Sequence, residues 1–217
     1  MTLHPSPATA AIRRIVPLPG SYPCGLTWDG SRLWHSDQPA GEIYELAESG
    51  TVLRTVPCRA VRADLTFDGD LLCQVGFRPK RLILIDRDSG KQIDRREVPP
   101  ASGRLTGVEH CADGIWMVLR GPTVLQLRDY ETMAVLREFP TGGSEPSGLT
   151  YADGVVVHGD YVERRVRATD AATGEELGSV LVDGNPTGMA WDGQHVWYCD
   201  FPGKRACALD LADILDS

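Results

Sequence analysis

Four side chains in this 217-residue sequence are of types that bind metal ions or transfer protons: Glu109, His35, His110 and His158. Imidazole and carboxylate ligands together suit divalent transition metals such as iron, zinc or manganese, and the same groups serve as general acids and bases. One hypothesis is that these four residues bind a metal ion and that the glutamate, His110 and His158 are also catalytic. In this hypothesis Arg120 binds an anionic group of the substrate. The alternative is that each is a packed or ion-paired structural residue, because no metal motif of fixed spacing joins them.

A second group of residues is predicted to contact a ligand. It comprises Cys24, Asp37, Arg78, Asp160, Tyr161, Cys199, Asp200 and Phe201. Cys24 is also a candidate nucleophile, because a neighbouring histidine can lower the pKa of a thiol. The sequence contains neither a Gly-x-Ser-x-Gly elbow nor a Cys-His family signature that would support nucleophilic catalysis. It also contains no glycine-rich, phosphate-cradling loop before a helix, and so predicts no nucleotide cofactor.

The elements that must position these candidates are set by a repeat. Its first copy is Pro-Cys-Gly-Leu-Thr-Trp-Asp-Gly at residues 23–30, and the Asp-Gly pair recurs at intervals of 39, 45, 40 and 39 residues. An Asp-Gly pair between two β-rich runs predicts a hairpin. A period of this length with strand-like content predicts a β-propeller.

Each of the first four repeats contains the four predicted strands of one propeller blade. In the first repeat these strands cover residues 26–28, 32–37, 42–46 and 51–56. The last repeat lacks a fourth strand and ends in a helical turn, whereas residues 12–18 resemble the fourth strands of the other repeats. We therefore expect an all-β, five-bladed β-propeller with four antiparallel strands per blade, in which the N-terminal strand closes the last blade and leaves no open edge. This single domain would span residues 12–217 after a flexible tail at residues 1–11; the alternative is a six-bladed ring completed by another chain.

Propeller geometry predicts where the candidates meet. In a blade, the start of the first strand and the end of the second lie on one face beside the central channel, which is the usual ligand site. Glu109 stands out because the other repeats have smaller residues at its position, namely Thr27, Thr66, Thr150 and Ala190. A carboxylate on an innermost strand is costly unless it is paired, protonated or bound to a metal. The structural alternative for Glu109 is an ion pair with Arg104 or Arg120.

The repeat also resembles known propellers. The pattern Pro-x-Gly-Leu-x-Trp-Asp-Gly, followed by a short strand ending in Ser-Asp or Cys-Asp, then an apolar strand and a glycine, resembles the NHL, SMP-30 and streptogramin-lyase-like propellers. The resemblance covers almost the whole chain and implies the fold; that superfamily includes lactonases, lyases and pure binding modules. SMP-30 lactonases bind a divalent metal through a glutamate near the N-terminus, where this chain has Cys24. Five blades and this length are also similar to the propeller-type glutaminyl cyclases, whose acidic active-site motifs find no match in this sequence.

Composition narrows the classes of partner. The formal net charge of −8 argues against nucleic acid or an anionic membrane as the main partner. The sequence has no run of eighteen apolar residues and no signal-peptide pattern at its N-terminus. Its six cysteines form no Cys-x-x-Cys pair, so we expect reduced thiols and a cytoplasmic protein.

Two hypotheses of function follow. The first is a small-molecule enzyme of lyase, hydrolase or isomerase type, with its site at the mouth of the central channel and with or without a divalent transition metal. The second is a non-catalytic propeller that binds a ligand or a protein partner, because a fold does not imply a function. A tight group of Glu109 and the histidines would favour the enzyme, whereas an apolar rim without a perturbed carboxylate would favour the binding module.

Overall fold

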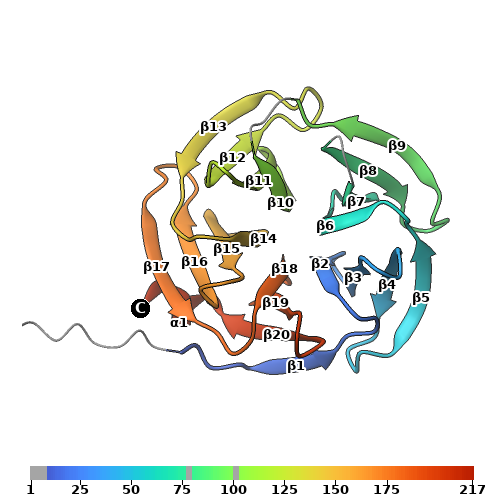
Figure 1. The fold of residues 1–217 in the computed structure, drawn as a ribbon, viewed down its shortest axis with the longest axis horizontal. Coiled ribbons are helices and arrows are strands. Elements are labelled where there is room, and N and C mark those ends of the chain that lie inside the picture. Colours follow the sequence, from blue (N-terminus) through green and yellow to red (C-terminus); the bar gives the residue numbers. More distant parts are fainter. Residues whose placement is uncertain (1–8, 77–79, 100–102) are drawn as a thin grey trace, which may run out of the picture.

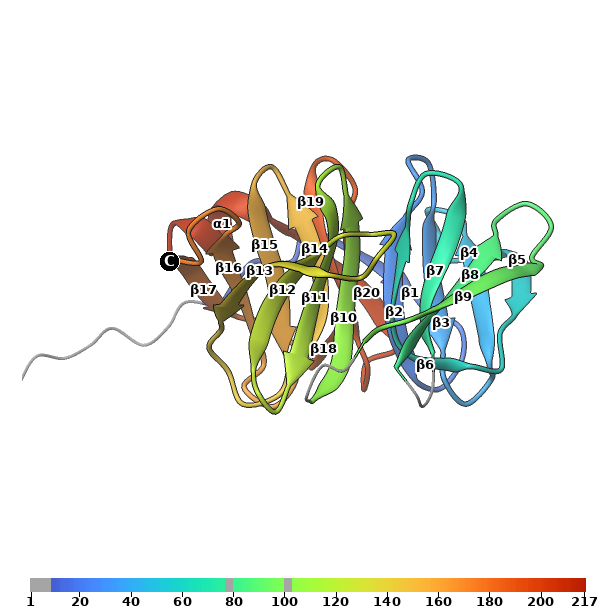
Figure 2. The same cartoon turned by 90° about the horizontal axis from the view of Figure 1, so that it is seen from above.

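The computed structural model describes residues 9–76, 80–99 and 103–217. In these residues, five antiparallel sheets of four strands stand around a common axis (Figure 1). Seen from the side, the strands cross the thickness of the disc, so that the loops gather at two opposite faces (Figure 2). The five-bladed β-propeller predicted from the repeat is confirmed.

Blades 1 to 4 each use four consecutive strands, which follow one another from the axis outward. Blade 1 contains β2 (Pro23–Trp28), β3 (Leu33–Asp37), β4 (Glu42–Leu46) and β5 (Val52–Pro57). Blade 2 contains β6 (Val61–Phe67), β7 (Leu71–Gly76), β8 (Arg81–Asp86) and β9 (Gln92–Glu97). Blade 3 contains β10 (Arg104–Cys111), β11 (Gly114–Arg120), β12 (Val124–Arg128) and β13 (Val135–Pro140). Blade 4 contains β14 (Pro146–Ala152), β15 (Val155–Asp160), β16 (Arg165–Asp170) and β17 (Glu176–Leu181).

Blade 5 joins the two ends of the chain. It contains β18 (Pro186–Trp191), β19 (His195–Asp200), β20 (Arg205–Asp210) and, outermost, β1 (Arg14–Pro17). Ile15 pairs with Cys207 in antiparallel register, so the predicted closure by the N-terminal strand is confirmed. Of the predicted tail, residues 9 and 10 are held against blade 4, where the Ala10 N–H donates to the carbonyl of Leu181.

The repeated Asp-Gly pairs form the hairpins that join the first and second strands of the blades. One carboxylate oxygen of Asp29 accepts two backbone N–H groups of the turn, and its other oxygen accepts the indole N–H of Trp34 at 2.8 Å. The same indole bond recurs between Trp197 and Asp192 at 2.7 Å. A side chain that bonds its own turn in this way stabilises the hairpin locally in blades 1, 2 and 5. In blade 4 the pair forms a two-residue turn instead, with positive φ at Asp153 and Gly154.

Burial decreases from the axis to the rim of the disc. The innermost strand β18 is almost wholly buried, whereas β9 is exposed along most of its length. The apolar side chains that fill the space between blades include Trp34, Trp116 and Trp197. The one helix in the described residues, α1 (Leu211–Leu215), covers five residues, and this part of the chain holds no helix with the length and apolar character that a membrane crossing needs.

Candidate functional site

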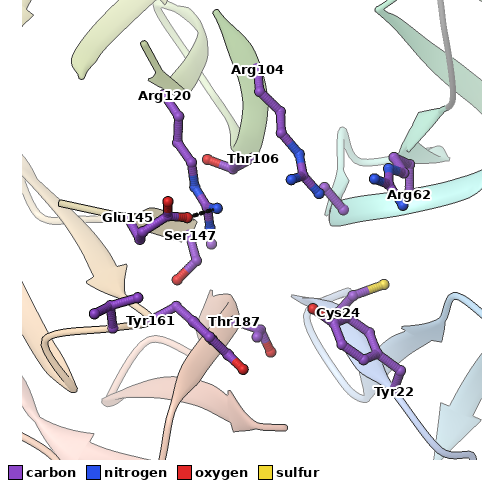
Figure 3. A pocket seen from close by; sticks show the side chains of 13 residues that line it. Tyr22, Cys24, Arg62, Arg104, Thr106, Arg120, Glu145, Ser147, Tyr161 and Thr187 are labelled. Carbon is purple, nitrogen blue, oxygen red and sulfur yellow. Dashed lines mark hydrogen bonds and ion pairs between the residues drawn. The ribbon is translucent and has the colours of Figure 1, made fainter. Parts of the chain in front are cut away.

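A cavity of about 210 Å³ lies at the axis, on the face where the innermost strands begin. We call it the mouth. Its lining residues come from the starts of the first strands and the ends of the second strands, as propeller geometry predicts: Tyr22, Cys24, Arg62, Ala63, Arg104, Thr106, Arg120, Glu145, Ser147, Gly148, Tyr161, Val162 and Thr187. Figure 3 shows these side chains around the opening.

One side of the mouth carries three arginines, which we call the cationic wall: Arg62, Arg104 and Arg120. They come from blades 2 and 3. The Arg120 guanidinium pairs with Glu145 and donates through Nε to the carbonyl of Pro146 at 2.7 Å. Partial burial lowers the pKa of Arg120; the charge of Glu145 opposes this, and the like charge of Arg104 adds to it. The lining of the mouth in the described residues thus holds three guanidinium groups and one carboxylate.

The opposite side of the mouth is aromatic. We call Tyr22, Tyr161 and Phe201 the aromatic wall. The ring of Phe201 lies 4.3 Å from that of Tyr22 and 6.2 Å from that of Tyr161, measured between centroids. In Figure 3 the Tyr22 hydroxyl points toward the centre of the opening, as do the guanidinium groups of Arg104 and Arg120. The mouth therefore offers an apolar surface across from positive charge.

The small side chains below the opening link neighbouring blades by hydrogen bonds. Thr106, Ser147 and Thr187 each donate a hydroxyl hydrogen bond to a carbonyl of the next blade, at 2.9, 2.6 and 2.9 Å. Cys24 instead contacts the carbonyl of Ser36. Burial raises the pKa of the Cys24 thiol to about 12, so the thiolate that a nucleophile requires is not formed near neutral pH.

The aspartates predicted to bind a ligand shape the mouth instead of facing it. Asp37 accepts the backbone N–H of Tyr22 at 2.6 Å, and Asp160 accepts that of Glu145 at 2.8 Å. Asp200 accepts the equivalent N–H in blade 5, that of Asn185, and also bonds Arg205. These carboxylates are buried at the ends of second strands. They hold the loop before each first strand, and so position the side chains that line the mouth.

A single carboxylate, that of Asp64, fills the axis below the mouth. Its position in the repeat is occupied by glycine in the other four blades, Gly25, Gly107, Gly148 and Gly188. A Cβ on Gly107 would lie 2.7 Å from the backbone of blade 4, so the inner strands are too close there for further side chains. Asp64 accepts backbone N–H groups of blades 1, 3 and 4 at 3.2, 3.4 and 2.9 Å.

Glu109 lies beyond Asp64, on the side away from the mouth. Along β6, Ala63 lines the mouth, Asp64 comes next, and Thr66 then donates a hydrogen bond to Glu109 at 3.0 Å. Thr150 donates to the other oxygen at 3.2 Å. Burial raises the pKa of Glu109 well above its ordinary value, and the charge of Asp64 raises it further.

Burial raises the pKa of both acids well above the ordinary value, and their hydrogen-bond partners differ in kind. Asp64 faces N–H groups, which can only donate and so favour its ionised form, although burial works against them and raises its pKa. Glu109 faces hydroxyl groups, which donate or accept. The ion pair between Glu109 and Arg104 or Arg120, expected as the structural alternative, is therefore not what the structure shows. The carboxyl group of Glu109 is instead hydrogen-bonded to two threonines.

The predicted metal ligands are not brought together. His35 and His158 are fully buried within blades 1 and 4, where burial lowers the pKa of each to about 4. His110 packs against Tyr130, with ring centroids 4.6 Å apart. Among the described residues, no three His, Cys, Asp or Glu side chains form a group that could hold a metal ion. The residues thus do not form the predicted divalent metal site, because His35 and His158 lie on the second strands of blades 1 and 4, and His110 packs against Tyr130.

Several predicted site residues do reach the mouth. Arg120, Cys24 and Tyr161 line it, and Phe201 backs it. Cys199 does not: it is fully buried, with its sulfur 3.9 Å from the carbonyl of Gly25. Arg78 lies outside the described residues.

The predicted site residues do not include Tyr22, Arg62, Arg104, Glu145 or Asp64, although propeller geometry places Asp64 at a first-strand start beside the channel. Aligning the repeats by their glycines would have found the last of these, because Asp64 alone replaces that glycine. The others fall two or three residues before that position in their repeats, where the chain enters the blade.

The chain is similar in fold to solved propeller structures. It matches the crystal structure of Myxococcus xanthus glutaminyl cyclase with a TM-score of 0.78 and 18% identity, over 94% of this chain and 99% of that one. It matches a chain of the nidogen/laminin complex with a TM-score of 0.64 and 14% identity, over 88% of this chain and 77% of that one. No protein-family model matches the sequence, and no curated protein matches it. At such identities the likeness concerns the fold, and the resemblance to NHL and SMP-30 propellers stays a prediction.

Proposed function

We propose that this propeller binds a small organic anion in the mouth. The acid group would lie against the cationic wall, and the body of the ligand against the aromatic wall. The observation that carries this proposal is the gathering of Arg62, Arg104 and Arg120 at one cavity of a protein whose net charge is −8. Guanidinium groups match carboxylates in geometry and charge, and a bound anion would offset the repulsion between Arg104 and Arg120.

The state of the reactive groups supports binding in preference to catalysis. The thiol of Cys24 has a raised pKa, and the hydroxyls of Thr106 and Ser147 are engaged by neighbouring blades. Glu109 is separated from the mouth by the residue that fills the axis. Of the two hypotheses from the sequence, the ligand-binding module thus has the stronger support.

Benzoate, as a simple aromatic acid, should bind at least ~10-fold more tightly than benzyl alcohol, because only the acid can pair with the cationic wall. Isothermal titration calorimetry at low ionic strength checks this, since salt screens the attraction. Arg104→Met should weaken benzoate binding by about tenfold and leave benzyl alcohol unchanged. Arg95→Met is the matched control, because Arg95 is exposed on the outer strand β9. Equal affinity for the acid and the alcohol would remove the proposal.

A second candidate is an enzyme that cyclises an N-terminal glutamine. It is favoured by the fold likeness to a glutaminyl cyclase and by the carboxylate of Glu145 at the mouth, which lies 44% exposed. In such a reaction the amino group attacks the side-chain carboxamide carbon and ammonia leaves, while a carboxylate carries the proton from the attacking to the leaving nitrogen.

Ammonia release from a peptide with N-terminal glutamine tests this second candidate. If it holds, the wild type should release ammonia faster than buffer, and Glu145→Gln should lose at least ~100-fold of that rate. Glu175→Gln, at an exposed site on blade 4, should keep the full rate. Release no faster than in buffer would remove the cyclase and leave anion binding as the function.

A further inference from the structure

A second cavity adjoins the mouth. It has a volume of about 250 Å³ and lies between blades 2 and 3. Its walls are Arg62, Lys80, Arg104, Val75 and Leu105, with the backbones of Gly76 and Gly103. We call it the side cleft. Arg62 and Arg104 line both the mouth and the side cleft, so these two guanidinium groups stand between them.

The side cleft is more strongly positive than the mouth. Among the described residues that line it, three are cationic and none is an aspartate or glutamate. Lys80 adds a charge that the mouth lacks, and burial together with the like charge of Arg128 lowers the pKa of Lys80. The side cleft therefore brings three cationic side chains to one cavity.

The repeat shows why this side of the ring is positive. Blades 1, 4 and 5 place Asp37, Asp160 and Asp200 at the end of the second strand. In these three blades the aspartate lies two residues after the second-strand residue that pairs with the apolar residue just after the glycine position of the repeat. The same position is occupied by Gly76 in blade 2 and by Leu119 in blade 3. The two blades that supply the arginines thus lack the carboxylate that the other three share.

Two glycines border the side cleft. Gly103 has φ of 88°, and a Cβ there would lie 2.2 Å from the carbonyl oxygen of Arg120. Gly76 likewise presents no side chain beside Lys80. A larger residue at position 103 would strain the strand entry, because its Cβ would also meet the carbonyl oxygen of Gly121 at 2.7 Å.

Resting on the anion-binding function proposed above, we propose that the ligand carries two acid groups. One lies in the mouth against Arg104 and Arg120, and the other lies in the side cleft against Arg62 and Lys80. The ligand class is a small molecule with two carboxylates, or with a carboxylate and a phosphate, because both groups pair with guanidinium and ammonium ions.

A homologous series of acids tests the inference. Malonate, succinate, glutarate, adipate and pimelate are titrated into the wild type by calorimetry, each beside the monocarboxylate of equal chain length. One length should fit both sites and bind at least ~10-fold more tightly than its monocarboxylate. Lys80→Met should abolish that advantage without changing monocarboxylate binding. Lys91→Met, at an exposed turn of the same blade, should keep the advantage.

The outcomes separate the two proposals. Monocarboxylates that bind as tightly as every diacid would overturn the second acid site and leave the anion-binding mouth standing. A diacid advantage that survives in Lys80→Met would also overturn it, because the gain would then be general attraction to the arginines. If neither monoacids, diacids nor benzoate bind, the function proposed for the mouth fails as well.

Discussion

Replacing Asp64 with alanine should lower the free energy of unfolding by about 3–5 kcal/mol, because three buried N–H groups would lose their acceptor. These are the backbone N–H groups of Leu26, Val108 and Leu149, in blades 1, 3 and 4. Asp64 belongs to blade 2, so one carboxylate ties together the inner strands of four blades. Urea-induced unfolding at pH 7, followed by tryptophan fluorescence, measures the loss.

Two further variants make the test specific. Asp64→Asn keeps one acceptor oxygen but turns an amide N–H toward the backbone donors, so its stability should fall between those of the wild type and Asp64→Ala. Asp70→Ala, at an exposed position of the same blade, should change stability by no more than ~0.5 kcal/mol. A loss below ~1 kcal/mol in Asp64→Ala would show that water replaces the carboxylate at the axis and that the tie between blades is weak.

The Glu109→Gln variant should become more stable relative to the wild type as the pH rises above about 4.5, the ordinary pKa of a glutamate. In the folded protein, burial and the charge of Asp64 raise the pKa of Glu109. Above its ordinary pKa, the folded state therefore holds a proton that the unfolded chain has lost. The wild type loses stability as the pH rises through this window, at up to ~1.4 kcal/mol per pH unit, until the folded pKa is passed.

The measurement is the difference in unfolding free energy between Glu109→Gln and the wild type at steps from pH 5 to pH 8. His35 and His158 act in the opposite direction, because a folded pKa of about 4 means that stability is lost as the pH falls from 6.5 toward 4. Both proteins share that effect, so it cancels in the difference. Glu175→Gln should run parallel to the wild type. A difference that does not change with pH would contradict the assignment of the proton to Glu109.

The architecture could be predicted because its signals are local and recur. In blades 1, 2 and 5 the aspartate of the Asp-Gly pair accepts backbone N–H groups of its own turn, as Asp29 does, so these hairpins rest on local bonds. The closure by β1 followed from counting strands, because an unpaired edge is unfavourable. Observed bounds differ from the predicted ones by a few residues; β2, for example, begins at Pro23 although the prediction began at residue 26.

The candidate site could be predicted only in part. Arg120 and Tyr161 reach the mouth because the ends of second strands share one face. Asp37 and Asp160 also lie at strand ends, yet their oxygens bond the entering backbone. The sequence marks Glu109 as unusual among the repeats, but its place along the axis depends on how deep Asp64 lies and on which strands approach it.

The sequence by itself determined the repeat, the number of blades and the way the ring closes, because each rests on local hairpins and on the pairing of strand edges. The tertiary structure decided which charged side chains meet. The arginines of blades 2 and 3 gather at one cavity, and the two carboxyl groups stack along the axis, only when five inner strands converge there. Convergence brings together residues 38 to 164 positions apart in sequence. The order of contacts across that ring cannot be deduced from the spacing of the repeat alone.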